Sequence, residues 1–248
     1  MRSLIYSTVF IQDSYLKLLW LLLNTYKRYG NTDNSVTYLV VCSEQFKPAI
    51  DNMFKRLQIN GMTWVFPVSH VIDAIFSRLH IFEWEHIHEF SRVLYLDTDI
   101  IIANDVKKVL EIDPGNKIYV LEEGTTKEKI HGAHYFGKNN PNVTAFTSGI
   151  ILFNNTNAIR RLFTEIMNDA RTKVPLGGIN IVDQPYIVYH AVKNDMYDNQ
   201  VLKPCAFNNP ESYQGHSILH FPGPIGAGDD KISVIQRFLS TQEQLLGS

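Results

Sequence analysis

Short apolar segments alternate along the chain with longer segments in which apolar residues recur every three or four positions. The first pattern predicts buried strands, and the second predicts amphipathic helices. Strands are expected at residues 3–9, 36–41, 63–66, 92–96, 117–121, 148–153 and 217–220. Helices are expected at residues 13–29, 44–57, 75–88, 157–171 and 182–192, and from about residue 231 onward. This alternation is typical of an α/β fold with a mainly parallel sheet.

The regular pattern stops between residues 125 and 144, where Gly, His, Asn and Pro are frequent. A loop of this length in a folded domain commonly acts as a lid or a binding loop, and its residues His131 and His134 are expected to be exposed. Gly177 and Gly178 predict a tight turn before the next helix. Since no linker-like stretch interrupts the chain, we expect a single domain.

The charge balance excludes the broadly basic surface of a general nucleic-acid binder, because 23 Lys and Arg residues face 25 Asp and Glu residues. Two cysteines, Cys42 and Cys205, exclude a disulfide scaffold and a Cys-rich zinc site. The strongest apolar run, residues 18–23, is far shorter than the roughly 20 residues that span a bilayer. With no membrane span or leader before the first strand, we expect a cytoplasmic protein; assembly into a homo-oligomer stays open.

Two acids separated by one residue, Asp97 and Asp99, directly follow the apolar strand at 92–96. In an open parallel sheet, ligands bind beyond the carboxyl ends of the strands. Carboxylates at such a place can hold a hard divalent cation, which can in turn hold a diphosphate. The alternative is a turn or a helix cap, for which acids at this spacing are also common.

Four further stretches have chemistry that fits the same site. Residues 7–15 follow the first strand, where nucleotide-binding loops usually lie. Arg78 can grip a phosphate with two nitrogens, Asp183 and Gln184 follow the glycine turn, and His220 at a strand end can ligate a metal. Each has a structural alternative: a surface ion pair for Arg78, a helix N-cap for Asp183, and a buried structural role for His220.

In this order the stretches resemble the glycogenin-like family 8 glycosyltransferases, from about residue 4 to residue 223. The matching segments are 8–15, 77–80, 95–99 with 103–104, 147–149, 183–184, 207–208 and 220–223. The resemblance implies the single-domain A-type glycosyltransferase fold, which is a Rossmann-like, mixed and mostly parallel sheet flanked by helices. It also implies a nucleotide-binding half at about 1–110 and a sugar and acceptor half at about 111–248.

What the family resemblance implies for the site can be stated residue by residue. Asp97, Asp99 and His220 would hold Mn²⁺ or Mg²⁺, and the donor would be a UDP-sugar whose sugar passes to a glycan or another hydroxyl acceptor. Asp183, Gln184 and Arg78 would be the catalytic residues, and family members retain the anomeric configuration. The residues implied to contact the donor are Thr8, Val9, Ile11, Gln12, Tyr15, Arg78, Thr98, Ser148, Gly149 and Gly223.

The sequence departs from the family pattern at two positions. Members commonly carry a lysine three residues after the last glycine of the His-Phe-x-Gly motif, where this chain has Gly226. Lys231 is a more distant substitute. Just before Asn208, where a glycogenin carries the tyrosine on which it builds its own glucan, this chain has Phe207. We therefore expect a separate acceptor molecule rather than self-glucosylation.

Two other functions fit part of the pattern. A nucleotide-sugar-binding protein without transfer activity would share the donor site, and the missing family lysine makes it conceivable. A sugar nucleotidyltransferase would use a related sheet, but such enzymes need a Gly-rich loop with a cation for the triphosphate. Residues 8–15 contain no glycine, lysine or arginine, which disfavours that activity.

Overall fold

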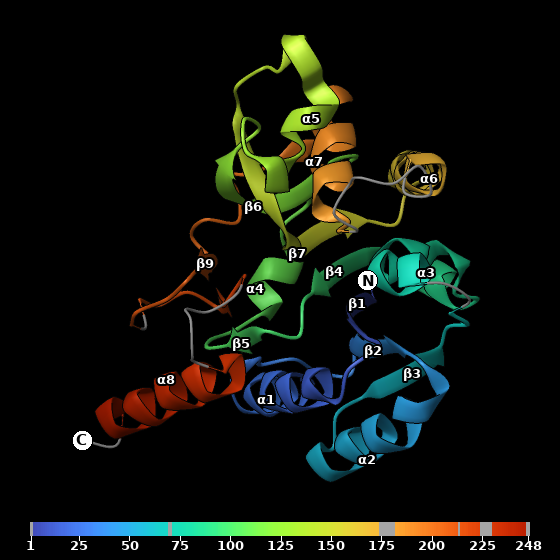
Figure 1. The fold of residues 1–248 in the computed structure, drawn as a ribbon. Coiled ribbons are helices and arrows are strands. Elements are labelled where there is room, and N and C mark those ends of the chain that lie inside the picture. Colours follow the sequence, from blue (N-terminus) through green and yellow to red (C-terminus); the bar gives the residue numbers. More distant parts are fainter. Residues whose placement is uncertain (1, 69–70, 174–181, 213, 224–229, 247–248) are drawn as a thin grey trace.

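The computed structural model describes residues 2–68, 71–173, 182–212, 214–223 and 230–246. Within these residues a seven-stranded sheet has the order β3-β2-β1-β4-β7-β6-β8 (Figure 1). Neighbouring strands are parallel except where β7 pairs with β4 and β6. The strands are β1 (Ser3–Val9), β2 (Val36–Cys42), β3 (Gly61–Val65), β4 (Arg92–Leu96), β6 (Ile118–Thr125), β7 (Thr144–Asn154) and β8 (Tyr197–Asp198). The predicted mixed, mostly parallel sheet is confirmed.

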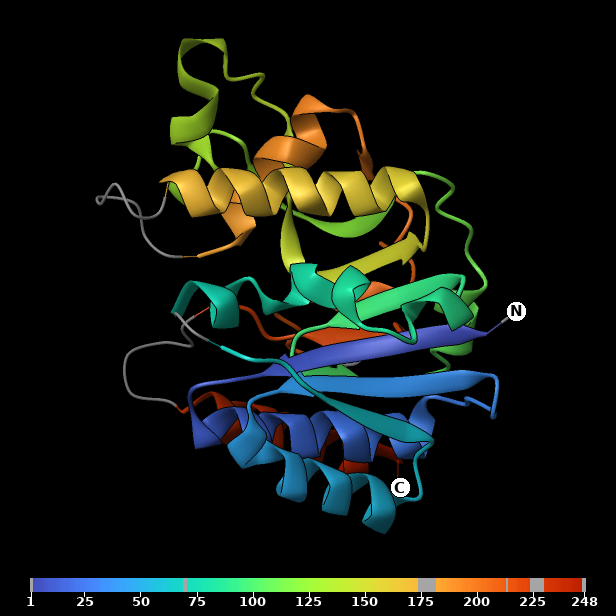
Figure 2. The same cartoon turned by 90° about the vertical axis from the view of Figure 1, so that its right-hand side faces the viewer.

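Helices cover both faces of this sheet, as Figure 2 shows with α6 (Asn157–Lys173) on one side and α1 (Asp13–Tyr29) and α2 (Lys47–Leu57) on the other. All seven residues of β2 and all five of β4 are buried. Strands that are covered on both faces consist of continuous apolar runs, and for this reason the sequence predicts these two strands. Helix α7 (Gln184–Lys193) packs on the α6 side, and the short α4 (Lys107–Leu110) on the α1 side.

A small second sheet lies beside the carboxyl end of β4. It consists of β5 (Ile100–Ile102), β10 (Ile218–His220) and β9 (Ala206–Asn208), with β10 antiparallel to β5 and parallel to β9. The C-terminal helix α8 (Lys231–Leu246) packs on this sheet and on α1 (Figure 1). The small sheet therefore joins the C-terminal segments to the loop that carries Asp97 and Asp99.

The helix expected at residues 75–88 is wrong. The chain forms α3 (Val71–Ile75), then the 3₁₀ helices η2 (Ser77–Glu83) and η3 (Ile87–Glu89). Buried apolar residues recur at every third position, Ile81, Trp84, Ile87 and Phe90, a spacing that suits short 3₁₀ turns better than one continuous α-helix. Trp84 and Phe90, at which η2 and η3 end, have extended backbone, so the segment is divided into short pieces.

The segment at 125–144, expected to be a loop, contains η4 (Lys129–His131), α5 (Ala133–Phe136) and η5 (Gly137–Asn139). The remaining 3₁₀ helix, η1 (Glu44–Phe46), leads into α2. The final helix begins at Lys231 as predicted, whereas β5 was not predicted at all. The Gly177–Gly178 turn lies outside the described residues. In the described part of the chain, no helix is both long and apolar enough to cross a membrane.

We expect Phe163→Ala to lower the free energy of unfolding by about 3–5 kcal/mol, since truncation leaves a cavity in a packed core. Phe163 is 1% exposed, and its ring lies 5.3 Å from that of Phe153 and 5.5 Å from that of Phe82. Urea denaturation measures the loss. Phe207, which is 36% exposed, supplies the control: Phe207→Ala should cost less than about 1 kcal/mol. Equal losses would contradict this account of the core.

Candidate active site

The two acids after β4 are fixed by backbone hydrogen bonds to strands from elsewhere in the chain. The Asp97 amide donates to the Gly149 carbonyl of β7 at 2.8 Å, and the Phe221 amide donates to the Asp99 carbonyl at 3.0 Å. Antiparallel pairing of β10 with β5 aligns His220 with Ile100, directly after Asp99. As a result, ligand atoms of Asp97, Asp99 and His220 all lie within 4.8 Å of one another.

The imidazole of His220 is oriented by Asn208 on the neighbouring strand β9. Its Nδ1 lies 2.9 Å from the Asn208 Oδ1, an acceptor, so Nδ1 carries the proton and Nε2 keeps a free lone pair. Nε2 lies 3.4 Å from the Asp99 Oδ1, which is buried and accepts no hydrogen bond. A lone pair and an unpaired carboxylate oxygen that face each other are what a metal ion needs, and such an outer partner sets the tautomer of a ligating histidine.

Gly149 leaves the space between these groups open. A Cβ at this position would lie 2.6 Å from the His220 Nε2 and 2.9 Å from the Asp97 Oδ2. The donor set of two carboxylates and one imidazole suits a divalent cation such as Mn²⁺ or Mg²⁺. The residues present therefore fit a divalent metal, although they do not select between those two ions.

Contacts with His220 and with the Lys231 ammonium hold Asp99 in its ionised form. Burial alone would raise its pKa, but His220 and Lys231 outweigh that effect and bring the pKa to about 2. The Lys231 Nζ lies 2.5 Å from the Asp99 Oδ2. A carboxylate that stays charged while buried is prepared to bind a cation.

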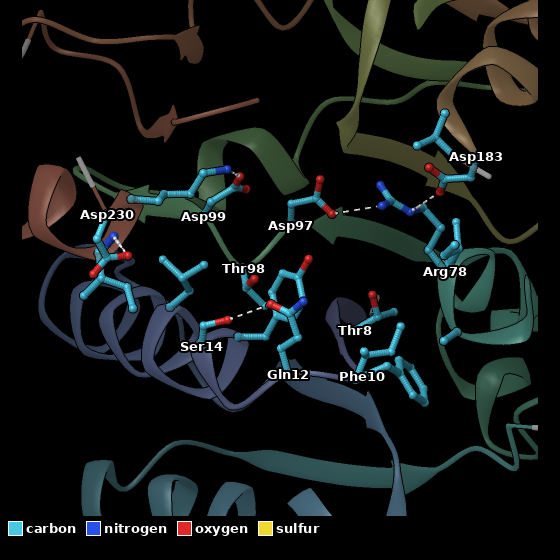
Figure 3. A pocket seen from close by; sticks show the side chains of 18 residues that line it. Thr8, Phe10, Gln12, Ser14, Arg78, Asp97, Thr98, Asp99, Asp183 and Asp230 are labelled. Atoms are coloured by element: carbon cyan, nitrogen blue, oxygen red, sulfur yellow. Dashed lines mark hydrogen bonds and ion pairs between the residues drawn. The ribbon is translucent and has the colours of Figure 1, made fainter. Parts of the chain in front are cut away.

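Arg78 connects three parts of the site (Figure 3). Its Nη2 lies 3.2 Å from the Asp97 Oδ1, its Nε 2.7 Å from the Asp183 Oδ2, and its Nη1 donates to the Ser148 carbonyl at 2.6 Å. The guanidinium also stacks on the Tyr95 ring, 4.5 Å from its centroid. Burial alone would lower the pKa of Arg78, but Asp183 and Asp97 raise it above its ordinary value. With its side chain only 12% exposed, Arg78 is not a surface ion pair.

Asp183 occupies the position just before α7, but its carboxylate does not cap the helix. It faces Arg78 instead, as an ion pair without the alignment of a hydrogen bond. Burial raises the pKa of Asp183 and so outweighs the opposite effect of Arg78. A buried carboxylate that has a raised pKa and one charged partner is typical of active sites.

Gln184 is fixed from both sides. Its Oε1 accepts from the backbone N–H of Ser148 at 3.0 Å and lies 3.2 Å from the Ser148 hydroxyl, while its Nε2 donates to the Glu123 Oε2 at 3.3 Å. The His131 Nε2 lies 3.4 Å from the same Glu123 oxygen. Since His131 is 1% exposed, the expectation that it lies in solvent is wrong, whereas His134 is exposed. Burial of the His131 ring against Glu123 is the physical reason.

Sequence reasoning missed Glu123 and the orienting role of Asn208. A usable signal existed for Glu123, because it comes two residues after the apolar run at 117–121, much as Asp97 comes after the run at 92–96. No local signal identifies Asn208 as the partner of His220, since only the pairing of β9 with β10 brings them together.

A cavity of about 610 Å³ opens beside the acids. The predicted residues among those that line it are Thr8, Ile11, Gln12, Tyr15, Arg78, Asp97, Thr98, Asp99 and Asp183. The other predicted residues are not among those that line it: Val9, Ser148, Gly149, Gln184, His220 and Gly223. Val9 is fully buried in the core shared with α1. Side chains of a strand alternate between faces, and Val9 points to the opposite face from Thr8. The contact of Val9 with a nucleotide stays a prediction. Gly223, with a φ of 73°, is exposed shortly after His220.

The loop between β1 and α1 contains a strained turn at the mouth of this cavity. Ile11 has a φ of 72°, and the Gln12 amide donates to the Phe10 carbonyl at 2.8 Å across it. A γ-turn with positive φ is rare, and for a β-branched residue it is strained. The turn leaves the Ile11 side chain 57% exposed beside Tyr15, which is 41% exposed. Strain of this kind is found most often at ligand sites.

A family model described as glycosyl transferase family 8 matches residues 42–188, more than half of the chain. A search of curated proteins finds no match. Among solved structures, the chain is similar to the galactosyltransferase LgtC in complex with donor and acceptor sugar analogues. The TM-score is 0.65 at 15% identity, covering 96% of this chain and 94% of that one.

Two other solved structures are similar at the level of the fold. Mouse xyloside xylosyltransferase 1 has a TM-score of 0.64 at 14% identity, covering 90% of this chain and 100% of that one. The bifunctional glycosyltransferase WbbM has a TM-score of 0.63 at 17% identity over 90% of this chain. This chain spans 46% of the length of WbbM. These likenesses show the A-type glycosyltransferase fold.

We expect Gly149→Ala to weaken divalent metal binding by at least about tenfold, because the added methyl group occupies the space between His220 and Asp97. Calorimetric titration with Mn²⁺ measures this, and circular dichroism confirms that the variant is folded. Gly115→Ala is the control: a Cβ there meets nothing within 4 Å but strains a backbone with a φ of 57°, so this variant reports the effect of general backbone strain on metal affinity. Unchanged affinity in Gly149→Ala would show that the metal site lies elsewhere.

Proposed function

Since the chain belongs to glycosyl transferase family 8, we propose that this glycosyltransferase takes its sugar from a UDP-sugar, with Mn²⁺ or Mg²⁺ bound, and passes it to a hydroxyl of a separate glycan or other acceptor. The observation that carries the proposal is the group formed by Asp97, Asp99 and His220 at the edge of the 610 Å³ cavity. A cavity of that volume is within the range that holds a small-molecule ligand.

The nucleoside end of the donor lies against the loop between β1 and α1. Ile11 and Tyr15 offer exposed apolar surface for a base, and Tyr15 also carries a hydroxyl. Thr8 and Gln12 supply polar groups from the same loop, and Thr98 supplies a hydroxyl between the two acids. This arrangement supports a donor whose base lies at one end of the cavity and whose diphosphate lies beside Asp97 and Asp99.

The diphosphate end lies against the group of acids. Asp97, Asp99 and His220 would hold the cation, which when bound stabilises the negative charge that develops on the leaving UDP. Arg78 adds a fixed positive charge within the same wall, because Asp97, Asp183 and Ser148 hold its guanidinium in one orientation. Charge placed in advance needs no reorganisation while the bond breaks.

The reacting end of the sugar lies toward the start of α7. Asp183 presents a carboxylate that can face the positive charge developing on the anomeric carbon. Gln184 has one amide N–H committed to Glu123 and a second that can bind a hydroxyl of the sugar or acceptor. We propose retention of the anomeric configuration, as in the family that the sequence resembles. The acceptor then enters on the face of the leaving group, or Asp183 acts as the nucleophile.

The acceptor is proposed to be a separate molecule. Phe207 on β9 is 36% exposed and carries no hydroxyl on which a glycan could start. The division into a nucleotide-binding half at about 1–110 and a sugar and acceptor half at about 111–248 stays a prediction, as does the cytoplasmic location. Gly226, where the family commonly has lysine, lies outside the described residues.

We expect UDP to raise the melting temperature only when Mn²⁺ is present, and Asp97→Asn and Asp99→Asn to abolish that effect, because a ligand stabilises only the state that binds it. Thermal unfolding with UDP, with other nucleoside diphosphates and with EDTA measures this. Asp105→Asn is the matched control, since Asp105 accepts from Asn31 outside the cavity.

A panel of UDP-sugars then tests transfer, and NMR of the product gives its anomeric configuration. Binding without turnover would favour the inactive nucleotide-sugar-binding protein, and no UDP binding would overturn the proposal.

We expect Asp183→Asn to lower kcat by at least about a hundredfold while the Kd for UDP changes less than about threefold, because the carboxylate acts on the sugar rather than on the nucleotide. Steady-state kinetics and UDP calorimetry separate the two effects. The control is Asp169→Asn, which removes a carboxylate paired with Lys173 and His190 away from the cavity. An unchanged kcat would remove Asp183 from the reacting centre.

A further inference from the structure

Two cations line the cavity among its described residues, Arg78 and Lys231. Lys231 is the first residue of α8 and comes from the opposite end of the chain to the loop that binds the base. Its Nζ lies 2.5 Å from the Asp99 Oδ2, and the two side chains are 24% and 14% exposed. This short ion pair joins α8 to Asp99, one of the three residues that would hold the metal. The match to the family model, residues 42–188, does not include α8.

The backbone of α8 is anchored, so Lys231 does not reach Asp99 by chance from a loose terminus. Ile235, one turn further along the helix, is 1% exposed and belongs to one core cluster with Leu18 and Leu219. The Phe238 ring lies 5.4 Å from that of Phe221, which follows His220. The packing that positions Lys231 thus also includes the strand that carries the metal-binding histidine.

Each carboxylate at this site has a positively charged partner. Asp97 is paired with Arg78 and Asp99 with Lys231, and Asp183 shares Arg78. A divalent cation bound at Asp97 and Asp99 would add two positive charges within a few ångströms of the Lys231 ammonium. Like charges at such a distance in a partly buried site repel strongly. Lys231 holds the Asp99 Oδ2, whereas the oxygen that faces His220 is Oδ1. Lys231 and the metal therefore compete for the charge of the Asp99 carboxylate rather than for a single oxygen atom.

The two cations differ in their freedom to respond. Arg78 is held by Asp183, by the Ser148 carbonyl and by the Tyr95 ring, so its position is fixed. Lys231 ends in a compact charge on a flexible four-carbon chain, and this charge can move while the helix backbone stays in place. Once Asp99 is occupied, a polyphosphate that enters the same cavity can pair with Lys231, and so can Asp230, the other acid beside it in the cavity wall.

From these contacts we infer that Lys231 is the counter-ion of Asp99 before the metal binds, and that it leaves Asp99 to pair with the donor diphosphate once the metal site is filled. This inference rests on the proposed function, because it takes the ligand to be a nucleoside diphosphate. It makes Lys231 a catalytic residue of the leaving group. No bond to Lys231 forms or breaks, and no proton is transferred to or from it.

Calorimetry on Lys231→Met tests the inference with two opposite expectations. Without nucleotide, Mn²⁺ should bind about three- to tenfold more tightly than to the wild type, because its competitor for Asp99 is gone. With saturating Mn²⁺, UDP should bind about tenfold more weakly, because one cation for the diphosphate is lost. Uridine, which has no phosphate, should show no such difference between the two proteins.

The matched control is Lys107→Met. Lys107 is also paired with an aspartate, at 3.0 Å from the Asp33 Oδ2, but on an exposed surface away from the cavity. It should leave both affinities unchanged. Lys231→Arg, which keeps the charge, should hold UDP affinity within about threefold of the wild type. Lys231→Arg also supplies the comparison if Lys231→Met does not fold, since a loss of UDP binding in Lys231→Arg would contradict the inference.

The outcomes separate this inference from the function on which it rests. If wild-type protein binds UDP with Mn²⁺ and Lys231→Met binds both ligands equally well, Lys231 is only a structural partner of Asp99 and the inference is wrong. A weaker UDP affinity without a gain in Mn²⁺ affinity would overturn the competition for Asp99. If wild-type protein does not bind UDP at all, the proposed function itself fails.

Discussion

Two partly buried carboxylates at the carboxyl end of β4 must be matched by positive charge, and much of this structure serves that requirement. Asp97 is matched by Arg78 from η2, and Asp99 by Lys231 from α8. Both cations come from segments distant in sequence, and each segment is fixed by its own apolar packing. Burial of Leu79 and Ile81 anchors η2, and this segment holds Arg78 between Asp97 and Asp183.

The group formed by Asp97, Asp99 and His220 depends on the close approach of the β7 backbone as much as on its own side chains. Strand β7 passes so near the acids that only a glycine fits at position 149. The small sheet performs the complementary task, since β10 brings His220 beside Asp99 and β9 brings Asn208 to orient the imidazole. The backbone and the Asn208 contact therefore bring three ligand atoms together without ordering a long, flexible side chain. Such preorganisation lowers the entropic cost of binding a cation.

Behind the reacting end, a chain of polar contacts runs from Ser148 through Gln184 to Glu123 and His131. Each member restricts the next, so the Gln184 amide is held in one orientation. The segment that supplies His131 reads as a loop in the sequence, yet it folds into short helices that bury this imidazole. The site is thus rigid around Gln184, whereas beside Asp99 one flexible cation, Lys231, remains.

The sequence by itself determined the strands covered on both faces, such as β1 and β4, and the Asp-x-Asp after β4, because these depend on local periodicity and on residues adjacent in the chain. It also identified the stretches that meet at the cavity, through their resemblance to a family. Tertiary structure decided the rest: that Val9 faces the core, that His131 is buried, that Glu123 contacts Gln184, and that Lys231 reaches Asp99. These contacts join residues far apart in sequence, and no local pattern of polar and apolar residues records which distant side chain a folded sheet brings alongside.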